Sequence, residues 1–134
     1  MIKKITALIL IVTSQFLLTS PAYGAKTLAE CQQADLTINE ASSCLDGVTK
    51  AIDRELQTWV NNHVFNLEEK ALITGRYSAL KMFKRSQSNF ITFRDNDCRW
   101  RYLMISPEKG ANIAYKKCYI QLSQLRIKEL SKVK

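Results

Sequence analysis

Apolar residues recur at three- and four-residue steps along most of the chain beyond Ser42, which is the spacing of amphipathic helices. The first such stretch carries Leu45, Val48, Ile52, Leu56, Trp59 and Val60. Ser42 or Ser43 can cap its start by accepting a hydrogen bond from a free backbone amide. Paired asparagines favour turns over helix interiors, so this helix is expected to end around Asn61-Asn62-His63. Residues 25–41 show no sustained period and predict one short helical turn.

A second helical start follows at Asn66, which can cap while Glu69 reaches back, as in a capping box. Apolar periodicity then continues to about Leu103. A single helix over this span would be about 55 Å long, whereas a compact domain of this size has a radius of gyration of about 13 Å. We therefore expect a break at Thr74–Gly75, with a long helix from about Arg76. A continuous helix in an elongated bundle is the alternative.

The last helix is expected from Glu108 or Ala111 to Lys132, because Pro107 disfavours helical geometry in the residue before it. The sequence contains no Asn-Gly hairpin, no alternating strand pattern and no internal repeat. The predicted fold class is therefore all-α, a small antiparallel bundle of three to four helices.

The first 24 residues have the composition of a secretory signal peptide. Lys3 and Lys4 precede an apolar run over residues 5–18, and small residues follow up to Gly24. This run is shorter than the about 20 residues that span a bilayer. We expect cleavage after Gly24, with an inner-membrane anchor or a lipoprotein as the alternatives. The prediction is a periplasmic or secreted protein with one domain over residues 25–134 and no membrane insertion after cleavage.

The exported part would be moderately basic. Removing 24 of the 134 residues leaves 110, with 18 basic and 12 acidic side chains and a net charge of +6. Such a charge predicts attraction to acidic partners, whether protein, lipid headgroup or anionic wall polymer. No basic and aromatic motif indicates a nucleic-acid partner, and the pattern does not define an oligomeric state.

All four cysteines, Cys31, Cys44, Cys98 and Cys118, fall in the exported part, which predicts two disulfides in an oxidising compartment. Four cysteines allow three pairings. Cys98 lies on one helical stripe with Phe90 and Arg94, and Cys118 lies on another with Tyr115, Leu122 and Leu125, which suggests that these two helices face each other. Zinc is the competing use, but the chain has no Cys-x-x-Cys and a single histidine.

No catalytic arrangement is visible in the sequence. The lone His63 is expected on the surface of a turn, with no nucleophile beside it. Glu68 and Glu69 are adjacent and would point in different directions, unlike the carboxylate pair of a glycosidase. Asp95 and Asp97 lack a third oxygen ligand at calcium-loop spacing. We predict no catalytic residue, no metal site and no cofactor, hence a protein that is not an enzyme.

Arg94 is a full charge placed among apolar positions. One interpretation is a guanidinium that binds a carboxylate or phosphate of a ligand. The other is an internal partner, since an unpaired buried charge is very costly. We favour the internal partner, and Asp53, Glu55 and Glu129 are the candidates. Gln87, on the same helical face, would join the network.

The motif Gln87-x-x-Phe90-x-x-Phe93-Arg94-Asp95-x-x-Cys98, followed by Cys118-x-x-x-Leu122-x-x-x-Arg126-x-x-x-Leu130, resembles the lysozyme inhibitor LprI-like N-terminal domain family. Its members are small, exported, cysteine-paired helical proteins of bacterial envelopes. The resemblance extends from Cys31 to Leu130 and implies the pairs Cys31–Cys44 and Cys98–Cys118. It also implies a structural polar network of Gln87, Arg94, Asp95 and Arg126. Two positions differ from common family choices, with Phe90 for Trp and Ser123 for Thr.

The resemblance implies a lysozyme inhibitor that acts by protein–protein contact. Animal lysozymes are basic, so a net charge of +6 favours an acidic or neutral muramidase, amidase or secreted toxin as target. The alternatives are an immunity or accessory protein against a secreted effector toxin and a passive envelope protein that binds anionic wall polymer. Arg99, Trp100, Arg101 and Tyr102 form the predicted partner-binding segment, because Trp, Tyr and Arg dominate interface hot spots. In the alternative interpretation Trp100 completes the core.

Overall fold

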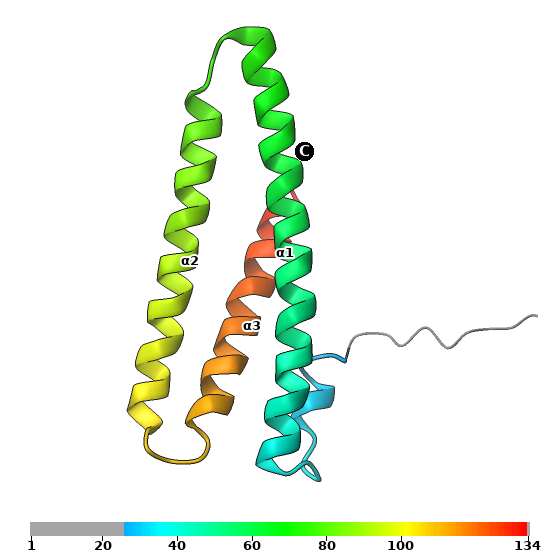
Figure 1. Ribbon diagram of the computed structural model, residues 1–134, viewed down its shortest axis with the longest axis vertical. Coiled ribbons are helices and arrows are strands. Elements are labelled where there is room, and N and C mark those ends of the chain that lie inside the picture. Colours follow the sequence, from blue (N-terminus) through cyan, green and yellow to red (C-terminus); the bar gives the residue numbers. More distant parts are fainter. Residues whose placement is uncertain (1–25, 134) are drawn as a thin grey trace, which may run out of the picture.

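The computed structural model describes residues 26–133, so the predicted signal peptide over residues 1–24 and its cleavage site lie outside the described residues. A short 3-10 helix, η1 (Glu30–Gln32), precedes three long helices, α1 (Ile38–Thr74), α2 (Ser78–Ile105) and α3 (Ala111–Leu130). α1 and α2 run antiparallel, and α3 returns beside their lower halves (Figure 1). The described part contains no strand, and the predicted all-α fold is confirmed.

α1 begins earlier than predicted. Its N-cap is Thr37, whose hydroxyl accepts a hydrogen bond from the Glu40 amide while the Glu40 carboxylate accepts one from the Thr37 amide. This reciprocal capping box satisfies two amides that would otherwise lack partners. The predicted start at Ser42 or Ser43 is therefore wrong. Ser42 lies inside the helix, and its hydroxyl accepts a hydrogen bond from Lys116 Nζ at 2.7 Å.

The predicted helix end at Asn61-Asn62-His63 is also wrong. α1 is 37 residues long and continues past these residues to Thr74. Asn61 and Asn62 are exposed, and the Asn61 side chain accepts a hydrogen bond from Gln57 Nε2 at 2.8 Å, one turn earlier. The cost of two asparagines in a helix is a fraction of a kcal/mol each, about 0.7 at most. Packing of the apolar stripe on the opposite face outweighs this cost.

The break predicted at Thr74–Gly75 is confirmed. Gly75 adopts φ 70°, and its amide donates to the Ala71 carbonyl at 2.8 Å. Glycine adopts this left-handed conformation at no steric cost, which ends α1 there. Asn66 and Glu69 therefore lie within α1 and start no helix. The C-cap of α2 is Ser106, directly before Pro107, as the sequence predicts.

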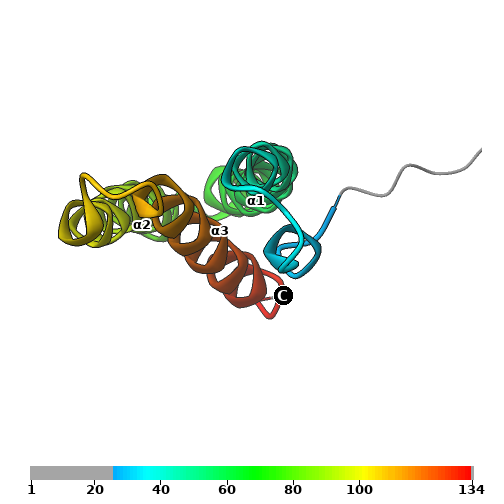
Figure 2. The same ribbon diagram turned by 90° about the horizontal axis from the view of Figure 1, so that it is seen from below.

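α3 packs between α1 and α2 (Figure 2). The main core joins Leu45, Val48, Ile52 and Leu56 of α1 to Ile120, Ile127 and Leu130 of α3, with Cys31 beside them. Because α3 has neighbours on two sides, its buried residues do not follow one stripe. Leu125, predicted on the stripe of Cys118, is 58% exposed, whereas Ser123 is fully buried.

Two disulfides cross-link the lower part of the bundle, as predicted. Cys31–Cys44 joins η1 to α1, and Cys98–Cys118 joins α2 to α3, each with a Cα–Cα distance of 5.5 Å. These are the pairs that the family resemblance implies. Cys98 is fully buried, so this cross-link lies inside the contact between α2 and α3.

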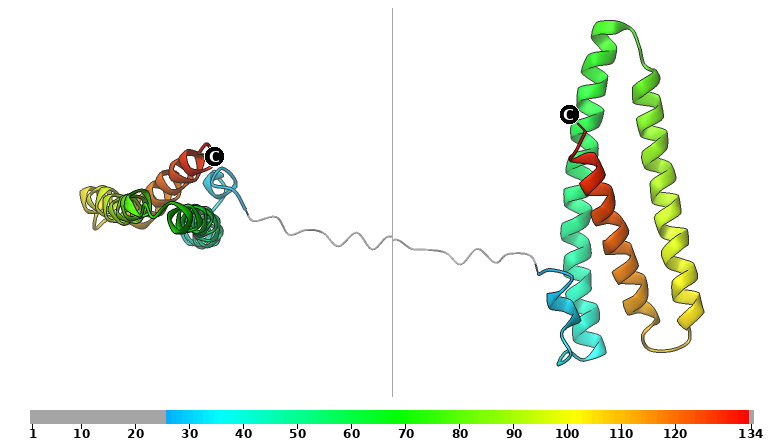
Figure 3. Two further views of the ribbon diagram at one scale, coloured as in Figure 1. Left: turned by 90° about the horizontal axis from the view of Figure 1, so that it is seen from above. Right: turned by 180° about the vertical axis from the view of Figure 1, so that it is seen from behind.

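The upper part of the α1–α2 hairpin extends beyond α3 (Figures 1 and 3). His63 marks the level at which α3 ends, because its Nε2 lies 2.9 Å from the carbonyl oxygen of Leu130. A carbonyl can only accept, so Nε2 carries the proton and caps the C-terminus of α3. The prediction of a surface histidine in a turn is therefore wrong. His63 lies within α1 and is partly buried.

Candidate functional site

Arg94 is the buried charge of the bundle, with 5% of its surface exposed. Its Nη1 donates to Ser123 Oγ at 3.0 Å and lies 3.8 Å from Asp53 Oδ1, and its Nε lies 3.4 Å from Asp95 Oδ1. The guanidinium also stacks on the ring of Tyr119. Partners from α1, α2 and α3 thus surround Arg94, and an external anion could not reach it without displacing them.

Tyr119 connects the same group to α1. Its hydroxyl donates to Asp53 Oδ1 at 2.9 Å. Burial, reinforced by this hydrogen bond to a carboxylate, raises the pKa of Tyr119 to about 12. The phenol therefore stays protonated at neutral pH and remains a donor.

Arg126 of α3 organises a second polar group, about two turns of α2 away from Arg94. Its guanidinium donates to Gln87 Oε1, Glu129 Oε2 and Ser86 Oγ, each at 3.2 Å. The ring of Phe90 separates the two arginines, and each guanidinium carbon lies 5.6 Å from its centroid. The structure therefore places Gln87 with Arg126, while Asp95 stays with Arg94. Glu129, a candidate partner of Arg94, pairs with Arg126 instead.

The four residues of the predicted partner-binding segment do not form one patch. Successive helical residues are about 100° apart, so Arg99 to Tyr102 are distributed around α2. Arg99 and Tyr102 line one hollow together with Tyr115 of α3. Trp100 and Arg101 lie on another side of the helix. Trp100 is 51% exposed and does not complete the core.

Trp100 and Arg101 are held in place by Asp97. Trp100 Nε1 donates to Asp97 Oδ1 at 3.0 Å, and Arg101 Nη2 lies 3.0 Å from Asp97 Oδ2. The guanidinium carbon of Arg101 lies 5.4 Å from the Trp100 ring centroid. The hydrogen bond from Trp100, together with the charge of Arg101, lowers the pKa of Asp97. The carboxylate thus orients an aromatic and a cationic side chain at the surface.

Further large apolar side chains surround this pair on the outside of α2. Phe93, Leu103 and Met104 are 55%, 60% and 71% exposed. We name Phe93, Trp100, Arg101, Leu103 and Met104 the α2 face. The spacing of Phe93, Trp100 and Met104 puts them on one side of the helix, away from buried Arg94 and Cys98. This spacing is visible in the sequence, although the prediction of a consecutive segment missed it.

A comparison with protein-family models decides the family. The model described as Lysozyme inhibitor LprI matches residues 29–130, from η1 to the end of α3. The chain belongs to the lysozyme inhibitor LprI family. A comparison with curated proteins finds no match, and one with solved structures finds none either.

LprI membership assigns the chain to a family of inhibitors, whose name implies a lysozyme-type hydrolase as the protein target. The match includes both disulfides, both arginine groups and the α2 face. Acting on a wall hydrolase implies a place outside the cytoplasm. In residues 26–133 of this LprI protein, no helix combines the length and apolar character needed to cross a membrane.

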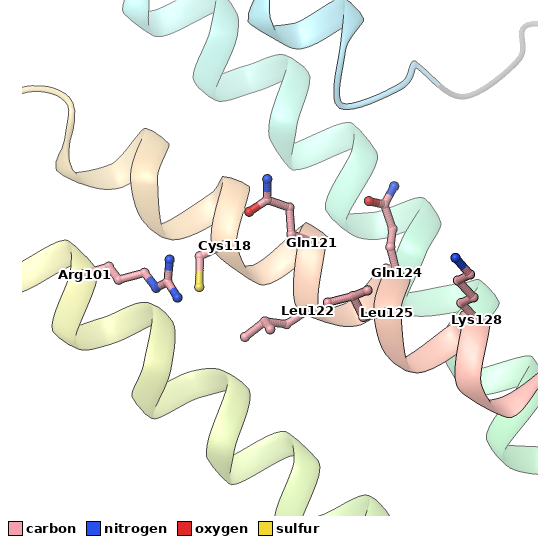
Figure 4. A pocket seen from close by; sticks show the side chains of 7 residues that line it. All are labelled: Arg101, Cys118, Gln121, Leu122, Gln124, Leu125 and Lys128. Carbon is pink, nitrogen blue, oxygen red and sulfur yellow. The ribbon is translucent and has the colours of Figure 1, made fainter.

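A shallow groove adjoins the α2 face of this LprI protein. It has a volume of about 500 Å³, and its lining consists of Arg101, Cys118, Gln121, Leu122, Gln124, Leu125 and Lys128. Arg101 extends from α2 and Leu122 from α3 into the space between the two helices (Figure 4). Within the described residues, no group of three or more His, Cys, Asp or Glu side chains is placed to hold a metal ion.

Proposed function

We propose that this protein is an exported inhibitor that binds a lysozyme or another peptidoglycan-degrading hydrolase through its α2 face. In this proposal the chain itself performs no reaction. It acts in the periplasm or the cell exterior after removal of residues 1–24. The observation that carries the proposal, beyond family membership, is the exposed Trp100 held beside Arg101 by one carboxylate.

The composition of the α2 face supports a role in protein binding. Trp and Arg are the residue types that most often dominate binding energy, and apolar neighbours exclude water around them. Soluble proteins seldom leave several large apolar side chains together on one surface without a partner. Phe93, Trp100, Leu103 and Met104 are all more than half exposed.

The scaffold behind the α2 face is rigid, which reduces the entropy lost on binding. Cys98 follows Asp97 directly, so the disulfide to Cys118 fixes the turn of α2 that carries Trp100. Arg94, one turn earlier, is held by groups on all three helices. A target would therefore meet side chains that are already oriented.

The net positive charge of the exported part favours one class of target enzyme over another. Opposite charges speed association and like charges slow it, so a basic inhibitor suits a neutral or acidic enzyme. The excess of basic residues in the exported part supports an acidic or neutral muramidase over a basic animal lysozyme.

The test measures hydrolysis of purified cell walls by an acidic bacterial muramidase and by a basic animal lysozyme. Each enzyme is titrated with the exported chain, purified with both disulfides intact. The expected result is saturable inhibition near equimolar ratio, stronger for the acidic enzyme. Absence of inhibition and of binding heat with both enzymes would overturn the proposal. Binding confined to a co-encoded secreted toxin would favour the immunity function.

A further inference from the structure

The far end of the α1–α2 hairpin is built differently from the rest of the surface. We name residues 70–82 the hairpin tip. They comprise the last turn of α1, the turn at Gly75 and the first turn of α2. This segment extends past the end of α3 along the long axis of the molecule (Figure 3). We propose that the hairpin tip docks on the surface of an anionic phospholipid bilayer.

The first observation is apolar exposure at the extreme end. Leu72 and Ile73 are 75% and 80% exposed, the two highest values among the large apolar side chains of the described residues. Tyr77 is 44% exposed just after the turn. Ala71 and Leu80 are buried at the same level, so the two helices already pack against each other without these side chains. Leu72 and Ile73 are therefore not needed for the packing of the hairpin.

The second observation is the charge around these side chains. Lys70, Arg76 and Lys81 are exposed, and none of the ion pairs in residues 26–133 involves them. No Asp or Glu occurs between Lys70 and Arg94. Glu68 and Glu69 directly precede the tip, and Glu68 pairs with Lys84 at 2.9 Å. The tip itself combines an aliphatic apex with three cations and contains no carboxylate, and anionic lipids attract such a surface.

Shape and composition together favour a bilayer over a protein cleft. Two helices side by side form an end about 20 Å wide, which is a small contact surface. A stable protein interface needs about 800 Å² from each partner, which a helical tip cannot easily supply. A bilayer requires no shape complementarity. Tyrosine suits the headgroup region, and long Lys and Arg side chains keep their charges there while aliphatic groups go deeper.

Docking in this way involves no membrane-spanning helix. It therefore remains compatible with the prediction that the exported chain does not insert across the membrane. Tyr77 and Trp100 are separated by 23 positions along one helix, which corresponds to about 35 Å. A bound tip would hold the α2 face well away from the lipid, where a wall hydrolase could approach it. The tip proposal does not depend on the target of the α2 face.

The test is co-sedimentation of the exported chain, with both disulfides, with two kinds of vesicle. One kind is pure phosphatidylcholine, and the other contains about 30% phosphatidylglycerol to provide negative surface charge. We expect stronger binding to the anionic vesicles and weakening by about 0.5 M salt, which screens surface charge. Replacing both apex residues, Leu72→Asp with Ile73→Asp, should lower the partition coefficient about tenfold or more.

Matched variants test whether vesicle binding depends on the tip or on exposed apolar and basic residues in general. Ile38→Asp with Val133→Asp changes two exposed apolar residues elsewhere and should leave vesicle binding unchanged. Lys81→Gln should weaken binding to anionic vesicles about fivefold, as expected for one cation near the surface. Lys50 is an exposed lysine on the lower part of α1, and Lys50→Gln should leave vesicle binding unchanged. All these side chains are exposed, so the thermal midpoint serves as the check that each variant is folded.

Two results would overturn the proposal. The first is absence of binding of the wild-type chain to anionic vesicles. The second is equal binding by the wild type and the Leu72→Asp, Ile73→Asp variant. In that second case, loss of muramidase inhibition by the variant would make the tip a protein contact. Vesicle binding is measured without any hydrolase, so failure of the inhibitor function leaves this test intact.

Discussion

The guanidinium carbon of Arg94 lies 3.7 Å from the ring centroid of Tyr119, so a buried cation on α2 rests on an aromatic face of α3. The hydroxyl of the same tyrosine donates a hydrogen bond to Asp53 of α1, which is also the acidic partner of Arg94 on that helix. A closed set of contacts therefore joins all three helices at one level. Arg94 depends on the other members, because an unpaired buried charge would be costly.

Replacement of Arg94 should destabilise the fold. Arg94→Ala removes the charge-assisted hydrogen bond to Ser123 and the stacking on Tyr119, and we expect a loss of about 3 kcal/mol in the free energy of unfolding. Arg94→Lys should recover only part of this, because an ammonium cannot stack flat on the ring. Urea denaturation measures both. Arg85→Ala, at an exposed arginine of α2, is the matched control and should change stability by less than about 0.5 kcal/mol. A similar loss in both alanine variants would contradict the role given to Arg94.

The raised pKa of Tyr119 predicts a loss of stability at alkaline pH. The folded protein holds the phenol proton up to about pH 12, whereas the unfolded chain releases it near the ordinary pKa of 10.0. Below pH 10 both states are protonated and the contribution is fully present. It is lost as the pH rises from about 10 to about 12. Tyr119→Phe should therefore show a shallower decline of stability across this window, measured by urea denaturation at successive pH values. Parallel profiles for the two proteins would refute the prediction.

The continuity of α1 through Asn62 can be tested by substitution. Asn62 is an exposed helix-interior residue, so Asn62→Ala should raise the free energy of unfolding by about 0.5 kcal/mol through helix propensity. Asn62→Pro should lower it by about 3 kcal/mol, since proline removes a helical hydrogen bond. Thermal unfolding followed by circular dichroism reports both changes. A helix that ended at Asn62 would show the opposite response to alanine and tolerate proline.

The α2 face should carry the affinity for the hydrolase. Trp100→Ala removes an exposed aromatic side chain, and we expect inhibition to weaken about thirtyfold, as for a hot-spot residue, without a change in melting temperature. The measurement is the inhibition constant against the muramidase. Lys50→Ala is the control, because Lys50 is an exposed cation on α1, outside the α2 face, and should change inhibition less than about twofold. Equal effects at both positions would argue against the α2 face as the contact.

Backbone chemistry made some features of the fold predictable. Gly75 and Pro107 end their helices for local steric reasons that do not depend on the rest of the protein. The capping box of Thr37 and Glu40 has the same local character. The sequence contains the Thr-x-x-Glu pattern of a capping box at this position. The residues around it are polar and show no helical period, so the pattern alone marks the start of α1.

Other features depend on tertiary packing and could not be read from local patterns. α1 continues past Asn61 and Asn62 because its other face stays packed against the neighbouring helices. This packing stabilises the helix more than the low helix propensity of two exposed residues destabilises it. α3 buries Cys118 and Ile120 because it has a helix on each side. A single stripe is expected only for a helix with one covered face.

The candidate site was predictable in its residue types more than in its geometry. Exposed Trp100 and Arg101 belong to the predicted binding segment, whereas Arg99 and Tyr102 face another side of α2. Phe93 and Met104 lie outside the predicted segment, because residues that share one side of a helix are not consecutive in the sequence. The role of Asp97 as the partner of both Trp100 and Arg101 required side-chain positions.

The Cys98–Cys118 disulfide can form only in an oxidising compartment, so the rigidity of the α2 face depends on where the chain is located. Thiols stay reduced in the cytosol and oxidise outside it. In the proposed function, the turn that presents Trp100 therefore lacks the covalent support of the Cys98–Cys118 bond until the chain is exported. The cross-link closes a separation of 20 residues, a stabilisation of about 3 kcal/mol on the entropic model. On that proposal, the chain before export is less stable, and its α2 face gains covalent support only outside the cytoplasm.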